Sequence, residues 1–365
     1  MLNLTANLIQ ANIIMVIIRQ IWIILIVLNC IMQGYASSFP DERQDDRAGL
    51  FDTDTLLEME FYLEWDSLFN DIGEDPDYHE GTLVYFNSTG TRREIEVEAR
   101  ARGGFRKNPD NCDFPLLKLK FKKKNVEGTV FEGLKDIKMV THCQNEIADF
   151  EQFLLQEYLI YKTYNLYTPL SLNTRLARIH YLDSQWPKDT LTRFAFFLEN
   201  PEDMASRNDG ELLELESAQE DKLDQDQMAM MAIFNYMIIN TDYSVPIMHN
   251  VILVSRDYFE PPLPVPYDFD WSGLINIPYD SPYMTYIAEF PERVYKGPCF
   301  KMKKLVDILS EFELKRRQIF TLFVEIPYLD EEIKSRNIQD LNLFYIMSGN
   351  TKLIREAFIM GCEPK

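Results

Sequence analysis

The segment 240–273 constrains the fold more than any other part of the sequence, because polar clusters stand at the ends of two short apolar strands. The first cluster is N-T-D at 240–242, and H-N at 249–250 leads into the first strand, which is predicted over 251–255. The second strand ends in D-F-D at 268–270. Carboxylate and amide oxygens suit hard cations such as Mg²⁺ or Mn²⁺. The segment therefore predicts a divalent metal beside a general base; a hairpin with turn-favouring Asp and Asn residues is the alternative.

The length and charge of the chain bound what it can bind. Its 365 residues, 46% of them hydrophobic, are enough for one large bilobal domain or two medium ones with a sizeable core. Acidic residues outnumber basic ones 58 to 37, which gives a net charge of −21. Nucleic acid is excluded as a partner, since phosphate backbones need clustered Lys and Arg.

The N-terminus is predicted to be a targeting segment. Arg19 precedes a compact apolar run over 21–27, and small residues suited to cleavage end at Ala36. Residues 1–36 are therefore predicted to be a signal peptide, and the polar residues 37–50 a flexible leader. Polar interruptions of the apolar run disfavour a stable membrane span. We expect an exported protein: periplasmic, on the cell surface or secreted.

Export changes the meaning of the cysteines. Removal of the signal leaves Cys112, Cys143, Cys299 and Cys362, an even number in a compartment that permits disulfides. None of these pairs has the C-x-x-C spacing of a zinc site. Two disulfides or none are both compatible with the sequence.

The first half, residues 51–200, is predicted to be β-rich with one prominent helix. Alternating apolar and polar residues indicate strands, two of which flank a hairpin turn with Gly90 at its tip. The helix covers 149–164, where apolar residues recur at helical spacing. The predicted strands cover 56–65, 82–86, 93–102, 116–124, part of 131–143, 175–181 and 192–199.

Basic residues cluster around one of these strands. Arg102 and Gly103 precede it, and Lys118 and Lys120 share one of its faces by the period of two. A double glycine before a lysine strand indicates a phosphate-binding role, although an exposed decorated face is the alternative. Glu157 on the helix could orient a strand lysine by an ion pair.

The second half, residues 201–365, is predicted to be mainly helical, with the polar hairpin within it. A methionine-rich helix leads to residue 240, and two further stretches, 301–323 and 327–361, also have helical patterns. The fold class is therefore α+β.

Three motifs together resemble the spore coat protein H (CotH) kinase family. They are R-G at 102–103 before the lysine strand, N-T-D with the following H-N, and P-Y-D-F-D-W-S-G over 266–273. The resemblance covers roughly residues 50–300. It implies an atypical, exported, bilobal protein-kinase-like fold with a β-rich N-lobe and a mostly helical C-lobe. It also implies that ATP and Mg²⁺ or Mn²⁺ are the cofactors.

The resemblance also implies residue roles. Asp242 matches the catalytic base, Asn250 a metal ligand, and Asp268 or Asp270 the metal-binding aspartate. The remaining matches concern the nucleotide. Lys118 or Lys120 would contact the ATP phosphates with Arg102 and Gly103 close by. Glu157, with Glu151 as the weaker alternative, would pair with the lysine.

The sequence departs from the typical pattern in several places, since it has no G-x-G-x-x-G, no H-R-D and no D-F-G. Asp242 and Asn250 lie eight residues apart, further than in typical protein kinases, which predicts a longer catalytic loop. R-G is followed by G-F-R rather than by the Asn-Ser often seen in the family.

Two functions follow as hypotheses. The first is an exported kinase that transfers the γ-phosphate of ATP to hydroxyl groups of a protein substrate. The second is a catalytically degenerate, kinase-like binding or scaffold protein of the cell envelope or surface. Metal-dependent hydrolysis is disfavoured, because such sites usually contain several His and the chain has only four, of which His249 alone stands in the motif.

Overall fold

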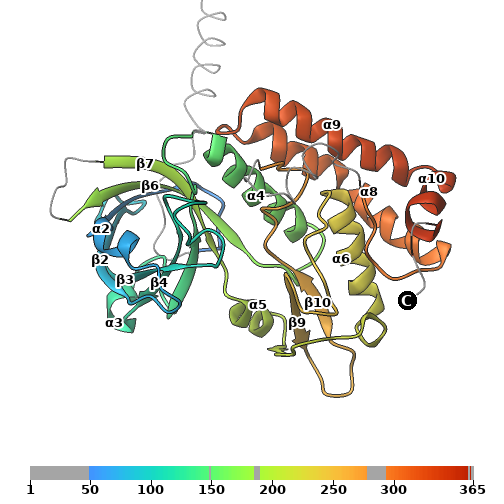
Figure 1. Cartoon of the computed structure of the whole chain (residues 1–365), viewed down its shortest axis with the longest axis horizontal. Coiled ribbons are helices and arrows are strands. Elements are labelled where there is room, and N and C mark those ends of the chain that lie inside the picture. Colours follow the sequence, from blue (N-terminus) through green and yellow to red (C-terminus); the bar gives the residue numbers. More distant parts are fainter. Residues whose placement is uncertain (1–48, 148, 185–189, 278–292, 361, 363–365) are drawn as a thin grey trace, which may run out of the picture. The chain divides into compact units, whose positions relative to one another are not determined.

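The computed structural model describes residues 49–147, 149–184, 190–277, 293–360 and 362. The predicted signal peptide, and the leader up to residue 48, lie outside these ranges. Within them the protein is a mixed α/β structure with a sheet-rich N-terminal region and a helical C-terminal part (Figure 1).

Seven strands of the N-terminal region close into a barrel in the order β1-β2-β3-β4-β5-β7-β6. Strands β1 and β6 pair in parallel, and every other neighbouring pair in the barrel is antiparallel. The strands are β1 (Leu57–Leu63), β2 (His79–Phe86), β3 (Arg92–Arg102), β4 (Leu116–Phe121), β5 (Asp136–Val140), β6 (Thr174–Asp183) and β7 (Thr190–Leu198).

Apolar side chains at every second position of the strands fill the interior of the barrel. In β3, Ile95, Val97 and Ala99 are buried, whereas Glu96 and Glu98 between them are more exposed. Aromatic rings add to this core: the Trp65 ring, from α2 (Trp65–Asn70), meets that of Tyr181 edge-on at 5.2 Å between centroids. In the described part of the chain, α2 and the short α3 (Lys123–Val126) are the helices that precede residue 149.

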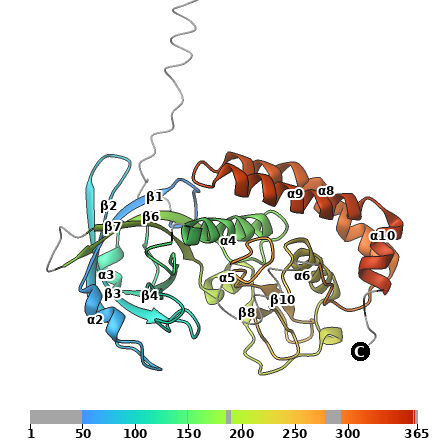
Figure 2. The same cartoon turned by 45° about the horizontal axis from the view of Figure 1, so that its top comes forward.

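Helix α4 (Asp149–Asn165) connects the barrel to the C-terminal helices (Figures 1 and 2). Most of its side chains are buried. Gln152 donates from Nε2 to the Tyr328 carbonyl at 3.3 Å, and its Oε1 accepts from the Asp330 backbone at 2.9 Å. These bonds tie α4 to the turn between α8 (Met302–Glu325) and α9 (Glu331–Ser348).

The segment that carries the polar clusters lies between α6 (Gln225–Met237) and α8 in the sequence. Asp224 caps α6, because its Oδ1 accepts from the backbone of Asp226 at 3.1 Å and of Gln227 at 2.8 Å. A small sheet in this part of the chain has the order β10 (Leu263–Pro266), β9 (Val251–Ser255) and β8 (Glu211–Leu212). The remaining elements are α5 (Pro201–Arg207), η1 (Glu220–Lys222), α10 (Thr351–Arg355) and η2 (Glu356–Met360).

Most predicted elements are confirmed. The predicted strand 251–255 coincides with β9, and the predicted helix 149–164 is shorter than α4 by one residue. The closed barrel is a finding, since alternation does not reveal which strands pair. The described residues form one compact unit. The division at residue 200 and the bilobal description both stay predictions.

The cysteines form two disulfides, Cys112–Cys143 and Cys299–Cys362. Of the two alternatives that the sequence left open, the structure selects bonded cysteines. Disulfides persist in oxidising compartments, so these bonds are compatible with an extracellular protein.

Candidate functional site

One cavity of about 520 Å³ contains most of the residues that the sequence singled out. Its lining combines four acidic side chains, three basic side chains and an apolar wall. The lining residues are Arg102, Gly103, Gly104, Phe105, Arg106, Leu116, Lys138, Val140, Glu157, Tyr161, Leu198, Asp242, His249, Asn250, Tyr267, Asp268, Asp270 and Trp271. The barrel strands and the loop between β3 and β4 therefore supply the cations, and the segment 240–273 supplies most of the acids.

Asp242 is held in a tight loop after α6. Its backbone N–H donates to Asn240 Oδ1 at 2.9 Å, and Asn240 Nδ2 donates to Asn235 Oδ1 of α6 at 2.8 Å. The loop then closes on itself, because Ser244 and His249 exchange two backbone hydrogen bonds of 2.9 Å. Asn235 of α6 thus holds Asn240, and Asn240 in turn holds the backbone of Asp242 at the cavity.

Both carboxylate oxygens of Asp242 accept hydrogen bonds. His249 Nε2 lies 2.9 Å from Oδ1, and Asn250 Nδ2 lies 3.0 Å from Oδ2 and 2.8 Å from the Asp242 carbonyl. Asn250 has a left-handed backbone, with φ of 53°, a conformation that Asn tolerates better than most residues. Both of these bonds use the amide nitrogen of Asn250. Its carbonyl oxygen Oδ1 is therefore the atom of this side chain that a cation could bind.

The two aspartates of D-F-D differ in their surroundings. Asp268 is exposed within the cavity, and its backbone N–H donates to the Tyr161 hydroxyl at 2.9 Å. Asp270 is buried and forms an ion pair with Arg106, with 3.2 Å between Oδ2 and Nη2. The sequence motif offers Asp268 and Asp270 equally as metal ligands, and only their neighbours in the tertiary structure distinguish them.

Glu157 meets an arginine in the structure. Its Oε2 lies 3.9 Å from Arg106 Nη2, and both side chains are buried. Burial raises the pKa of Glu157 well above its ordinary value, and the nearby carboxylate of Asp270 raises the pKa further. A strand lysine was expected as its partner, so the cation differs from the expectation.

Arg102 and Gly103 line the cavity at the end of β3. Arg102 Nε donates to the Leu117 carbonyl at 3.1 Å, which directs the guanidinium along the barrel end. Burial lowers the pKa of Arg102, while the charge of Asp268 opposes that shift. Gly103 has φ of +85°, which a side chain would strain, and this explains a glycine directly after the arginine.

Lys118 and Lys120 lie outside the cavity lining. Lys118 Nζ is 3.3 Å from Asp136 Oδ1, and Lys120 Nζ is 3.5 Å from Glu98 Oε2, both on the outer side of the barrel. The period-two argument identified the outer face of the strand correctly. The period of two does not reveal which residues of that face lie next to the cavity.

Lys138 of β5 is the lysine that lines the cavity. It pairs across the ladder with Lys118 on one side and with Leu198 of β7 on the other. Burial lowers its pKa, and the neighbouring charge of Arg102 lowers the pKa further. A lysine flanked by apolar residues in I-K-M-V, over 137–140, was the signal in the sequence.

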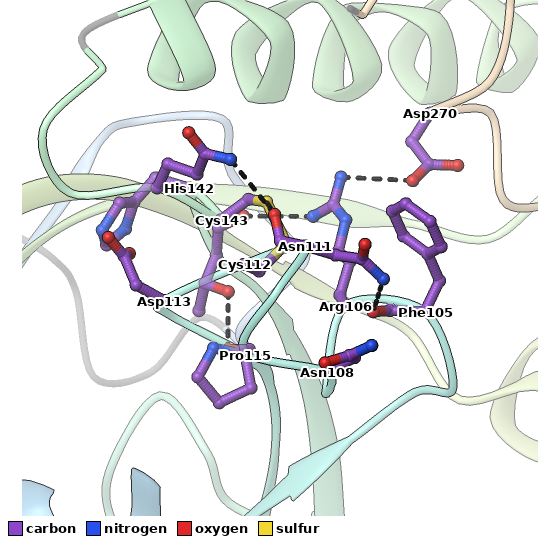
Figure 3. The surroundings of a disulfide bond; sticks show 12 residues. Phe105, Arg106, Asn108, Asn111, Cys112, Asp113, Pro115, His142, Cys143 and Asp270 are labelled. Carbon is purple, nitrogen blue, oxygen red and sulfur yellow. Dashed lines mark hydrogen bonds and ion pairs between the residues drawn. A yellow bond between two sulfur atoms is a disulfide. The ribbon is translucent and has the colours of Figure 1, made fainter. Parts of the chain in front are cut away.

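Arg106 was also not singled out, and a disulfide fixes the loop that carries it. Cys112 is bonded to Cys143, and Arg106 Nη1 donates to the Thr141 carbonyl at 3.2 Å. Asn111 Nδ2 donates to the Phe105 carbonyl at 2.9 Å. Figure 3 shows Arg106 reaching from this loop toward Asp270, with the disulfide beside it.

The donor set fits a hard divalent cation that also binds phosphate oxygens. Within the described ranges, no three His, Cys, Asp or Glu side chains gather closely enough to hold a metal by themselves. Mg²⁺ is commonly bound by one or two carboxylates together with substrate phosphates and water. The exposed carboxylate of Asp268 and Oδ1 of Asn250 are donors of this kind, whereas Asp270 is engaged by Arg106.

None of the helices in the described part of the chain has the length and apolar character that a membrane span needs.

The comparisons with known proteins show no family. No family model matches the chain, and no curated protein matches it either. A crystal structure of the Golgi casein kinase resembles it with a TM-score of 0.26 and 9% sequence identity, over 80% of this chain and 74% of that one. A likeness at this TM-score carries no argument, so the resemblance to the spore coat protein H family stays a prediction.

Proposed function

We propose that this protein is an exported, atypical kinase that transfers the γ-phosphate of ATP to hydroxyl groups of a protein, with Mg²⁺ or Mn²⁺. The observation that carries the proposal is the shared cavity of Asp242, Asn250 and Asp268 with the cations Arg102 and Lys138. Phosphoryl transfer requires a base, metal ligands and positive charge at one place, since its catalysis is mainly positioning and charge stabilisation. The proposed fold is kinase-like, with the barrel as N-lobe and the helical part as C-lobe.

Each polar group has a role in this proposal. Asp242 accepts the proton of the attacking hydroxyl. Asn250 and Asp268 hold the metal, which supplies neutralising charge at the phosphates when bound. Arg102 and Lys138 bind phosphate oxygens, with the Gly103 turn beside them. We propose Lys138 in the place first assigned to Lys118 or Lys120, because both of those lysines pair with acids outside the cavity lining.

The other two acids have structural roles in the proposal. Asp270 and Glu157 hold the Arg106 guanidinium at the inner wall of the cavity. An arginine in this position takes the place of the lysine that was expected to pair with Glu157.

The nucleobase has an apolar surface available on the barrel. Leu116, Val140 and Leu198 line the cavity from three different strands or strand ends, beside Lys138. A flat aromatic base would cover these side chains and exclude water from them. The proposed order along the cavity is therefore base, phosphates and acceptor hydroxyl.

A nucleotide-binding protein without phosphotransfer is the second candidate. It is favoured by the engagement of both Asp242 oxygens with His249 and Asn250, since the base must exchange one of these bonds for the acceptor hydroxyl. Such a protein would serve as a binding or scaffold component of the envelope or cell surface.

The test measures nucleotide binding and transfer separately on the oxidised protein. Melting temperature is recorded with ATP, with and without Mg²⁺ or Mn²⁺, and γ-labelled ATP is then incubated with the protein and with a mixture of acceptor proteins. The kinase proposal expects a metal-dependent increase in melting temperature and label on protein, with the label lost in Asp242→Asn. A shift without transfer supports the second candidate, and no shift with either metal overturns both.

A further inference from the structure

Lys296 contacts the backbone on both sides of the proposed base. Its Nζ donates to the Thr241 carbonyl at 2.7 Å and to the Tyr243 carbonyl at 3.0 Å. The same ammonium lies 5.4 Å from the centroid of the Tyr243 ring. The two carbonyls flank Asp242, so one side chain from a distant part of the sequence fixes the peptide segment that carries the carboxylate.

The chain segment around Lys296 is itself firmly anchored. Gly297 packs so closely on α6 that a Cβ atom there would come within 2.5 Å of the Ala232 Cβ. The Tyr295 hydroxyl donates to the Pro298 carbonyl at 2.9 Å, and the Cys299–Cys362 disulfide follows. Lys296 therefore projects from a fixed support, not from a loose loop.

Three side chains form hydrogen bonds to the backbone of the segment 241–243, and Lys296 is the third of them. Asn240 accepts from the Asp242 N–H, Asn250 donates to the Asp242 carbonyl, and Lys296 holds the carbonyls before and after it. The first two come from the motif itself, whereas Lys296 comes from the segment that leads into α8. With all three in place, rotation of the peptide units that would turn the carboxylate away is restricted.

We propose that Lys296 is a positioning residue for the phosphotransfer reaction, which orients Asp242 toward the acceptor hydroxyl; this inference rests on the proposed function. A base must lie within hydrogen-bond reach of the proton that it accepts. Misplacement by about 1 Å can reduce the rate by about a hundredfold. Loss of Lys296 therefore affects the chemical step and leaves the nucleotide site, on the barrel side of the cavity, unchanged.

The experiment compares Lys296→Met with a matched control, Lys304→Met. Methionine keeps most of the apolar stem and removes the ammonium donor. Lys304 follows in the same region, with its ammonium 5.6 Å from the Phe300 ring and 2.8 Å from Asp226 Oδ1, and neither of these contacts involves the Asp242 loop. For each protein, kcat, KM for ATP and melting temperature are measured, and Lys296→Arg is added because arginine also donates to carbonyls.

We expect Lys296→Met to lower kcat by about ten- to a hundredfold with KM for ATP within about twofold of wild type. Lys304→Met should retain the wild-type kcat, and Lys296→Arg should recover part of it. The assignment is overturned if Lys296→Met retains kcat, if Lys304→Met loses as much, or if KM and melting temperature change in step with kcat. Wild-type protein without any transfer overturns the proposed function and this inference together, whereas transfer that Lys296→Met leaves intact overturns this inference alone.

Discussion

Arg106 and Asp270 form an ion pair in which Nη2 and Oδ2 are 3.2 Å apart, and this pair joins the loop after β3 to the segment after β10. Glu157 of α4 approaches the same guanidinium at 3.9 Å. Three elements far apart in the sequence thus meet around one buried positive charge. Asp270 therefore neutralises a buried arginine, which distinguishes it from Asp268, two residues earlier.

Removal of this guanidinium should destabilise the protein strongly. Arg106→Met leaves Asp270 and Glu157 buried without the cation that they share, and loss of one partner of a buried ion pair costs about 3–5 kcal/mol. Urea denaturation at pH 7 measures the loss. Arg100→Met is the control, because Arg100 pairs with the highly exposed Asp75 and such surface pairs contribute about 1 kcal/mol or less. Equal losses in the two variants would contradict the buried-pair account.

The two aspartates of D-F-D should separate metal binding from stability. Asp268→Asn should abolish the part of the ATP-induced melting shift that depends on Mg²⁺, with the free energy of unfolding unchanged within about 0.5 kcal/mol. Asp270→Asn should lower stability and keep a metal-dependent shift. The measurement is a thermal melt of each variant with ATP, with and without Mg²⁺. The assignment fails if Asp270→Asn alone loses the metal dependence.

Lys138 and Lys118 provide a matched pair for the phosphate site, since they face each other across the ladder between β4 and β5. Lys138→Met should weaken ATP binding about tenfold or more, because a hydrogen bond to a charged group contributes about 1.5–3 kcal/mol. Lys118→Met should remain within about twofold of wild type, since Lys118 lies outside the cavity lining. Calorimetric titration with ATP and Mg²⁺ measures both dissociation constants. A larger effect from Lys118 would return the phosphate role to the first expectation.

His142 should make the protein less stable as the pH falls. Burial lowers the pKa of His142 from 6.5 to about 4, so between these values the unfolded chain binds a proton that the folded protein does not. The contribution is present above pH 6.5 and is lost as pH decreases toward 4. Between pH 7 and pH 5 the loss is about 2 kcal/mol, at 1.36 kcal/mol per pKa unit.

The measurement compares wild type with His142→Gln by urea denaturation at both pH values. Glutamine has no charge to acquire, so the difference in unfolding free energy between the two proteins should shift by about 2 kcal/mol in favour of the variant on going to pH 5. Titration of all other groups cancels in this comparison, provided that the disulfides stay oxidised. A constant difference would show that His142 is not kept neutral by burial.

Local patterns in the sequence were sufficient for most elements and for much of the cavity. Asp242, Asn250, Asp268 and Arg102 were chosen from motifs of a few residues, and all four line the cavity. A motif fixes which side chains stand next to each other along the chain, and short loops keep them close in space.

The cations were harder to choose, because their partners are remote. Lys118 stands on the same face as its cross-strand neighbour Lys138, but its ammonium pairs with Asp136, and Lys138 is the lysine that lines the cavity. Arg106 stands in a loop without a pattern, and its place depends on the Cys112–Cys143 disulfide and on Asp270.

The sequence alone determined the strands, the main helices and the polar ends of β9 and β10, since periods of two and of 3.6 residues are local properties of the chain. Tertiary structure alone decided that seven strands close into a barrel, which cysteines bond and which cations meet Asp268, Asp270 and Glu157. These outcomes depend on strand order, register and pairing between residues that are distant in sequence. No local pattern records those pairings, because they form only when the barrel closes and α4 packs against it.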